Sequence, residues 1–134
     1  EAIKMSREQN KPIFLDFTGH GCVNCREMEA VVLNDKSVLE MLSKDFIVVS
    51  LYVDDRRELD EPFTDKNGLV YTEIGEKWSY LQESKFGALS QPYYVLVNSD
   101  GQPLNGAYAF DKKVHFDTLW EIMNWDVIES RLPL

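Results

Sequence analysis

Both cysteines of this chain lie in one C-x-x-C motif, Cys22 and Cys25, immediately after an apolar run and a glycine-containing turn. The apolar run covers residues 13–17 and is typical of a buried strand. Residues 26–33 contain neither Gly nor Pro and favour a helix. The motif is therefore expected where a strand passes into the N-terminus of a helix, the context in which C-x-x-C indicates a redox pair.

The spacing of the two cysteines has a chemical reason. Positions i and i+3 in the first turn of a helix lie on one face, so the two sulfurs can reach disulfide distance with little backbone change. Free N–H groups and the helix dipole at this end favour a thiolate at Cys22. We expect Cys22 to be exposed and to attack a partner's disulfide, and Cys25 to resolve the mixed disulfide.

Two other interpretations of the pair remain open. A purely stabilising disulfide is one, although so short a loop removes little entropy from the unfolded chain. Half of a zinc site is the other, with His20 as a third ligand. Structural zinc sites usually have four ligands, and His115 is the one Cys or His that remains in the chain.

Three stretches of the sequence resemble the thioredoxin superfamily and, more closely, the C-terminal thioredoxin-like domain of the DsbD family of thiol:disulfide interchange proteins. They are residues 11–17 (KPIFLDF), 21–29 (GCVNCREME) and 90–97 (SQPYYVLV). The resemblance covers nearly the whole chain and implies one thioredoxin-like domain over residues 1–134, with an insertion at about 54–72. Better-known members have Trp before the first cysteine, where this chain has Gly21 preceded by His20.

The resemblance also implies a function. A DsbD-like domain is a thiol:disulfide oxidoreductase that relays reducing equivalents through its redox-active disulfide, here Cys22–Cys25, to a disulfide-bearing partner protein. It needs no cofactor because the cysteines carry the electrons. Its electron donor is a transmembrane domain of the same full-length protein, and its compartment is the periplasm. Two alternatives to this reductase remain. One is an oxidant or isomerase of secreted proteins, and the other is a non-catalytic thioredoxin-like interaction module.

Two acidic residues match acids of that family. Asp16 interrupts the apolar run and, if buried, needs a partner or a raised pKa. By the resemblance it lies behind Cys25, and we expect it to act as the general base that activates Cys25. Glu29 matches a second acid, and both charges would raise the cysteine pKa values. A hydrogen-bonded structural acid at Asp16 and a solvated Glu29 are the alternatives.

The resemblance further implies a cis Gln91–Pro92 bond beside the cysteine pair, which leaves the backbone of Gln91 free to pair with an incoming peptide. A trans proline that opens an edge strand is the alternative. His20 is expected at the rim of the docking surface, or as an imidazolium that stabilises the Cys22 thiolate. The expected partner-binding residues are His20, Gly21, Val23, Asn24, Gln91 and Pro92.

Composition narrows the functional classes. The chain has 134 residues, which is enough for one domain with a core of its own. Its net charge of −9 argues against a nucleic-acid partner and against anionic membrane surfaces. The longest apolar run is far shorter than the roughly 20 residues needed to cross a bilayer.

The order of the expected elements predicts an α/β fold, with a central mixed β-sheet and helices on both faces. The first two strands should be parallel, and a final hairpin should add antiparallel strands. Residues 54–72 are highly charged and predict a solvated loop or an acidic docking loop. Strands are expected at 13–17, 46–53, 93–97 and 107–110, and helices at 1–10, 22–33, 38–42 (capped by Ser37), 72–85 (capped by Thr72) and 116–132 (capped by Asp117 or Thr118).

Overall fold

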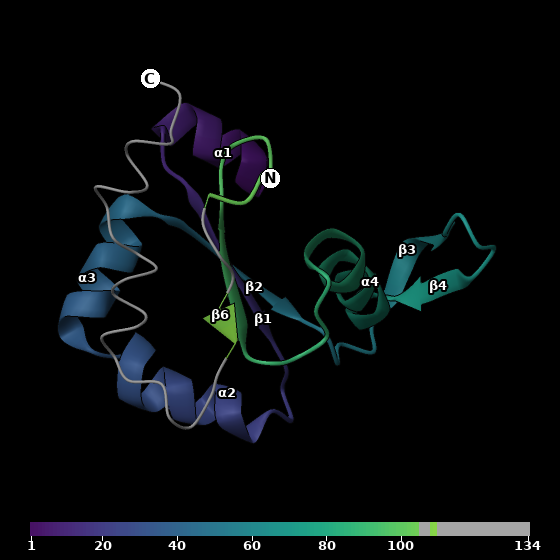
Figure 1. Cartoon of the computed structure of the whole chain (residues 1–134), viewed down its shortest axis with the longest axis horizontal. Helices are drawn as coiled ribbons and strands as arrows, with labels where there is room; N and C mark the ends of the chain where they lie inside the picture. Colours follow the sequence, from purple (N-terminus) through teal and green to yellow (C-terminus); the bar gives the residue numbers. More distant parts are fainter. Residues whose placement is uncertain (105–107, 110–134) are drawn as a thin grey trace.

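The computed structural model describes residues 1–104 and 108–109. Its central sheet has the strand order β2-β1-β5-β6 (Figure 1). Strands β1 and β2 are parallel, whereas β5 is antiparallel to both β1 and β6, so the sheet is mixed as predicted. The strands are β1 (Ile13–Thr18), β2 (Ile47–Tyr52), β5 (Tyr93–Val97) and β6 (Tyr108–Ala109).

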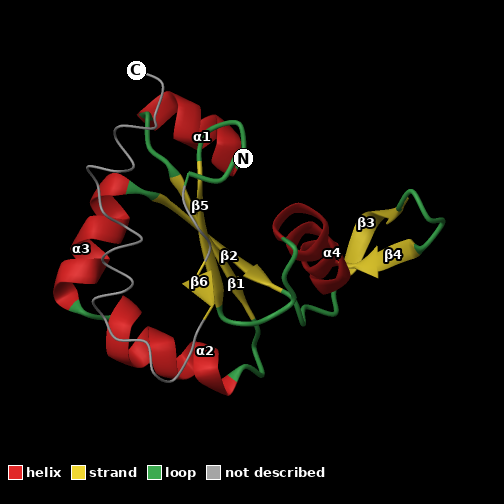
Figure 2. Ribbon diagram, viewed as in Figure 1, coloured by secondary structure: helices red, strands yellow, loops and turns green. Residues whose placement is uncertain are grey.

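Helices cover both faces of this sheet (Figure 2). Buried side chains of α2, the following π-helical turn η1 and α3 pack on one face, and partly buried side chains of α1 and α4 pack on the other. This arrangement confirms the α/β thioredoxin-like architecture expected from the sequence. The helices are α1 (Ala2–Gln9), α2 (Val23–Met28), η1 (Glu29–Leu33), α3 (Lys36–Asp45) and α4 (Ile74–Phe86).

The apolar strands β1 and β5 are buried on both sides because successive side chains point to opposite faces of a sheet. Phe14 and Tyr94 stack in the cluster under α2 and α3. Phe17 and Tyr93 belong to the cluster under α1 and α4, where Trp78 also packs. The strands therefore read as continuous apolar runs, which is typical of strands covered by helices on both faces.

Two expected helix caps are wrong by one or two residues. Asp35, and not Ser37, caps α3: its carboxylate accepts the backbone N–H groups of Ser37 and Val38 at 2.9 and 3.3 Å. Thr72 lies in a strand, and Glu73 caps α4 through a reciprocal capping box with Glu76. In both cases a carboxylate close to the helix start accepts free N–H groups and carries the charge that the helix dipole favours.

The charged segment after β2 was expected as a loop, and this expectation is wrong. It folds as an antiparallel hairpin of β3 (Glu58–Thr64) and β4 (Val70–Glu73), separate from the central sheet. Phe63 and Tyr71 stack with ring centroids 4.7 Å apart, and both contact Tyr80 of α4. These aromatic contacts hold the hairpin against α4 despite its charged surface.

Some expectations lie outside the described residues. They include His115, the closing helix at 116–132 with its proposed caps Asp117 and Thr118, and the two end residues of the strand expected at 107–110. The two middle residues of that strand are described and form β6. Within residues 1–104 and 108–109, no helix has the length and apolar character that a membrane span requires.

The strand registers bring three connecting segments to one end of the sheet. Thr18 at the end of β1 is opposite Tyr52 at the end of β2, and Phe17 is opposite Tyr93 at the start of β5. The turn at 19–22, the segment at 53–55 and the loop at 89–92 therefore meet at the same edge. This edge carries the cysteine motif.

Candidate functional site

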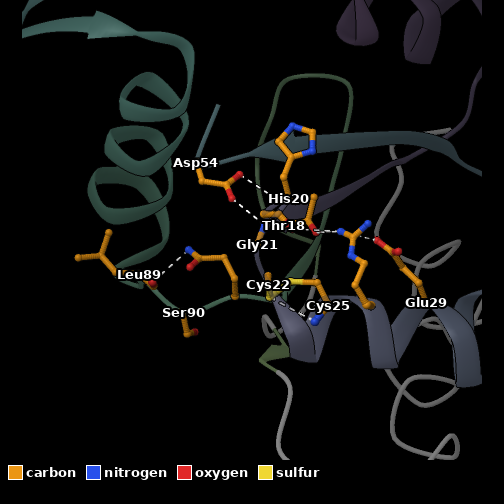
Figure 3. Close-up of a disulfide and its surroundings, with 12 residues drawn as sticks. Thr18, His20, Gly21, Cys22, Cys25, Glu29, Asp54, Leu89 and Ser90 are labelled. Atoms are coloured by element: carbon orange, nitrogen blue, oxygen red, sulfur yellow. Dashed lines mark hydrogen bonds and ion pairs between the residues drawn. A yellow bond between two sulfur atoms is a disulfide. The ribbon is translucent and has the colours of Figure 1, made fainter. Parts of the chain in front are cut away.

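A disulfide joins Cys22 to Cys25 at the N-terminus of α2 (Figure 3). Cys22 is the N-cap residue and is half-buried, whereas Cys25 is only 1% exposed. The backbone N–H of Cys25 donates to the sulfur of Cys22 at 3.2 Å. Cys22 is therefore less exposed than expected, but it is the more accessible of the two cysteines.

The turn before Cys22 is held by a carboxylate that the sequence analysis did not single out. Asp54 accepts the backbone N–H groups of His20 and Gly21 at 2.8 and 2.9 Å (Figure 3). These hydrogen bonds lower the pKa of Asp54 below its usual value. A Cβ on Gly19 would lie 3.2 Å from a carboxylate oxygen of Asp54, so a side chain there would press on this carboxylate and displace it by a few tenths of an ångström.

His20 lies at the exposed rim, and its ring stacks on Tyr52 with centroids 4.1 Å apart. The stacking fixes the imidazole over the end of β2. Of the two roles considered for His20, a position at the rim agrees with this contact. Tyr52 itself was not singled out from the sequence.

Asp16 is buried in β1. Its Oδ2 accepts a long hydrogen bond of 3.5 Å from the Ser50 hydroxyl, and its Oδ1 has no hydrogen-bond partner among the described residues. Burial, and then the negative charge of Glu29, raise the pKa of Asp16 to about 6. A carboxyl with this pKa can take up and release a proton near neutral pH.

Glu29 is partly buried and forms an ion pair of 3.0 Å with Arg26. It is therefore neither freely solvated nor an isolated charge. Arg26 also donates to the hydroxyl of Thr18 at 3.2 Å and to the carbonyl of Gly19 at 3.1 Å. The guanidinium ties α2 to the turn before Cys22 and partly offsets the two nearby carboxylates, a role that the sequence analysis missed.

The Gln91–Pro92 peptide bond is cis, the isomer that the resemblance implied. Pro92 is buried and Gln91 is half-buried. The side-chain amide of Gln91 donates to the carbonyl of Leu89 at 3.0 Å. Figure 3 shows Leu89 and Ser90 on this loop in the same view as the disulfide.

Two exposed apolar side chains lie close to these residues in the sequence, one within the cysteine motif and one in the loop that precedes Pro92. Val23, directly after Cys22, is 78% exposed, and Leu89 is 56% exposed. Asn24 is half-buried in the first turn of α2. Within the described part of the chain, no group of His, Cys, Asp and Glu is arranged to hold a metal ion.

Comparisons with known proteins agree with this architecture. Residues 1–116 match the family model of the thioredoxin-like domain. A DsbH oxidoreductase structure superposes with a TM-score of 0.65 at 16% identity, covering 98% of this chain and 81% of that one. A thioredoxin from Thermus thermophilus gives 0.63 at 20% identity, with coverages of 94% and 82%.

The oxidised C-terminal domain of DsbD from Neisseria meningitidis gives a TM-score of 0.57 at 19% identity, with coverages of 92% and 88%. At such identities these structures establish the fold alone. No curated protein shows significant sequence similarity to this chain.

Proposed function

The chain belongs to the thioredoxin-like domain family, and from this premise we propose that it is a thiol:disulfide oxidoreductase domain that passes reducing equivalents to partner proteins. One observation carries the proposal: the difference in exposure between the linked cysteines. Cys22 is half-buried at a helix N-terminus, whereas Cys25 is only 1% exposed. A purely stabilising disulfide does not require this asymmetry, whereas a two-step exchange does.

The reaction begins with the reduced pair. The Cys22 thiolate attacks one sulfur of a partner disulfide, so a mixed disulfide forms and the other partner sulfur leaves as a thiolate. Cys25 then loses its proton and attacks the sulfur of Cys22, which releases the second partner sulfur. The partner disulfide gains two electrons and two protons, and the Cys22–Cys25 disulfide forms.

Asp16 is the proposed base for the second step. It is buried beneath the helices, and its pKa of about 6 leaves it mostly ionised at neutral pH, yet basic enough to accept a proton from Cys25. Glu29 supports this role because its charge contributes to the raised pKa of Asp16.

The partner docks over the rim of the disulfide. Val23 and Leu89 offer exposed apolar contacts, and the backbone around Gln91 offers a main-chain edge for an extended segment of the partner. His20, Gly21, Asn24 and Pro92 complete this proposed docking surface.

The finer assignment is a DsbD-like reductase. A transmembrane domain of the same full-length protein would return two electrons and two protons to the disulfide in the periplasm. The sequence resemblance supports this assignment, together with the structural likeness to the DsbD domain. The whole of residues 1–134 would then act as one domain.

A Cys25→Ser variant tests the proposal. It retains the attacking sulfur but cannot resolve the mixed disulfide, so it should accumulate a covalent, dithiothreitol-sensitive complex with a partner in an extract of its native host. Cys22→Ser is the matched control and should trap nothing. A folded Cys25→Ser protein that captures no more than this control would contradict exchange chemistry.

The direction of electron flow needs a second measurement. Reduction potentials of related exchange proteins span about −270 to −120 mV. A potential near the reducing end would support a reductase, and one near the oxidising end would favour the oxidant or isomerase alternative.

A further inference from the structure

A buried polar side chain outside the disulfide motif, Gln82, has an amide that both donates and accepts a hydrogen bond. Gln82 in α4 has no solvent exposure, although glutamine is rarely so completely buried. Burying an amide is unfavourable unless its donor and acceptor both find partners. Its partners therefore indicate what this position contributes.

Both partners of the Gln82 amide lie on the loop before β5. Its Nε2 donates to the carbonyl of Ser90 at 2.8 Å, and its Oε1 accepts from Nε2 of Gln91 at 3.0 Å. The Gln91 amide also donates to the carbonyl of Leu89 at 3.0 Å. Three successive loop residues are thus linked to each other and to α4.

This loop enters the sheet at the edge that carries the disulfide, because Tyr93 is opposite Phe17 and the cysteine turn follows β1. A peptide that pairs with main-chain groups gains most when those groups are already ordered, since ordering them on binding costs conformational entropy. The side chain of Gln91 is bound inward to Gln82, so the segment has one fixed arrangement.

We propose that Gln82 is a positioning residue that holds the backbone of residues 89–91 ready for an extended segment of the partner protein. The inference rests on the proposed function, in which that segment carries the disulfide to be reduced. The hydrogen bonds of the Gln82 side chain join it to Ser90 and Gln91, and the proposed role involves no contact with the reacting sulfurs. Its effect should therefore fall on peptide recognition and leave the sulfur chemistry intact.

Two substrates separate recognition from chemistry. Insulin presents its disulfides in peptide segments, whereas 5,5′-dithiobis(2-nitrobenzoate) is a small aromatic disulfide without a peptide backbone. Gln82→Leu keeps a similar volume but leaves the Ser90 carbonyl and the Gln91 amide without this partner. We expect its KM for insulin, with dithiothreitol as reductant, to rise about tenfold, the equivalent of one lost buried hydrogen bond.

The same variant should react with the small disulfide at a rate within about twofold of wild type, because the Cys22 sulfur is unchanged. Gln82→Glu retains an acceptor for Gln91 but loses the donor to Ser90, and its KM should be intermediate. It also supplies the decisive measurement if the Leu variant does not fold. Amide hydrogen exchange at residues 89–91 should be faster in both variants.

Val38→Ala is the control for lost stability. Val38 is fully buried in α3, on the opposite face of the sheet, and its truncation weakens the core without touching the loop. It should leave both kinetic constants unchanged under conditions where the protein is folded. A KM for insulin in folded Gln82 variants that matches this control, or an equal slowing with both substrates, would overturn the inference. Wild-type protein that reduces neither substrate would instead contradict the proposed function on which the inference rests.

Discussion

The carboxylate of Asp54 accepts a hydrogen bond of 2.9 Å from the backbone N–H of Gly21, the residue immediately before Cys22. Asp54 follows β2, and it also accepts a hydrogen bond from the backbone N–H of His20. We call these two hydrogen bonds, from His20 and Gly21 to Asp54, the Asp54 clamp. The carboxylate thus satisfies two backbone donors that precede α2 and fixes the turn from which the exposed cysteine projects. The clamp links the start of the hairpin segment to the cysteine motif.

Removing this clamp should loosen the turn. In Asp54→Ala we expect the amide protons of His20 and Gly21 to exchange roughly tenfold faster or more, because charge-assisted hydrogen bonds are among the stronger ones. Nuclear magnetic resonance of the oxidised protein measures this directly. Asp65→Ala is the matched control, since Asp65 binds the N–H groups of Asn67 and Leu69 within the hairpin turn. It should leave the exchange at His20 and Gly21 unchanged.

The Asp54 clamp should also weaken in acid. Its pKa is lowered in the folded protein, so its contribution to stability is present above the ordinary carboxyl pKa and is lost as the pH falls through the folded value. Amide exchange at His20 and Gly21, corrected for the intrinsic effect of pH, should therefore show less protection only at strongly acidic pH. Loss of protection already near neutral pH would be inconsistent with a lowered pKa.

Replacing Asp16 by Asn should stabilise the oxidised protein at neutral pH. The pKa of Asp16 is about 6 in the folded state, against roughly 4 in the unfolded chain. Between these values the folded state holds a proton that the unfolded state has released, so wild-type stability falls as the pH rises through this window. Asp16→Asn should exceed wild type by up to about 3 kcal/mol above pH 7 and equal it below about pH 4. Urea unfolding across this pH range measures the free energy of unfolding of both proteins and shows whether the two values converge in acid. A stability difference that does not change with pH would exclude titration of Asp16 as its cause.

The pair of Arg26 and Glu29 should tune Asp16 in opposite directions. The charge of Glu29 raises the pKa of Asp16 and that of Arg26 lowers it, so Glu29→Gln should lower this pKa and Arg26→Gln should raise it. Carbon-13 shifts of the Asp16 carboxyl follow the titration. Glu27→Gln changes an exposed residue of the same helix and controls for general charge. A shift in Glu27→Gln as large as that in Glu29→Gln, with a shift of equal size and opposite sign in Arg26→Gln, would show that only net charge matters.

Much of the fold follows from local patterns in the sequence. Strands β1 and β5 are short apolar runs, and a strand covered on both faces leaves this pattern whatever its partners are. Strand β2 is also a β-branched run, although it is only partly buried. The two cysteines are visible for the same reason, because their chemistry depends on a spacing of three within one helical turn. The resemblance to thioredoxins supplied the positions of Asp16, Glu29 and Pro92.

The parts that were missed depend on contacts between distant residues. Asp54 and Gly21 are separated by 33 positions, and nothing in either neighbourhood marks their hydrogen bond. The charges of residues 54–72 predict a loop, whereas the hairpin packs through Phe63 and Tyr71 against Tyr80 of the next helix. Gln82 looks like an ordinary surface residue until α4 is placed against the loop before β5.

Gly75 should be intolerant of any side chain, because α4 begins in direct contact with the segment that carries Asp54. The backbone N–H of Gly75 donates to the carbonyl of Asp55 at 2.8 Å, and a Cβ on Gly75 would lie 2.5 Å from the carbonyl oxygen of Val53. Backbone cannot move aside as a flexible side chain does, so we expect Gly75→Ala to cost about 1–3 kcal/mol of stability in urea unfolding. It should also speed amide exchange at Gly21, since displacing residues 53–55 shifts the Asp54 clamp.

The control for this prediction is Gly87→Ala. Gly87 has a positive φ of 68° and open space around it, so its substitution should cost about 1 kcal/mol and leave exchange at Gly21 unaltered. If both variants lose the same stability and neither changes that exchange, the contact between α4 and residues 53–55 does not hold the turn before Cys22.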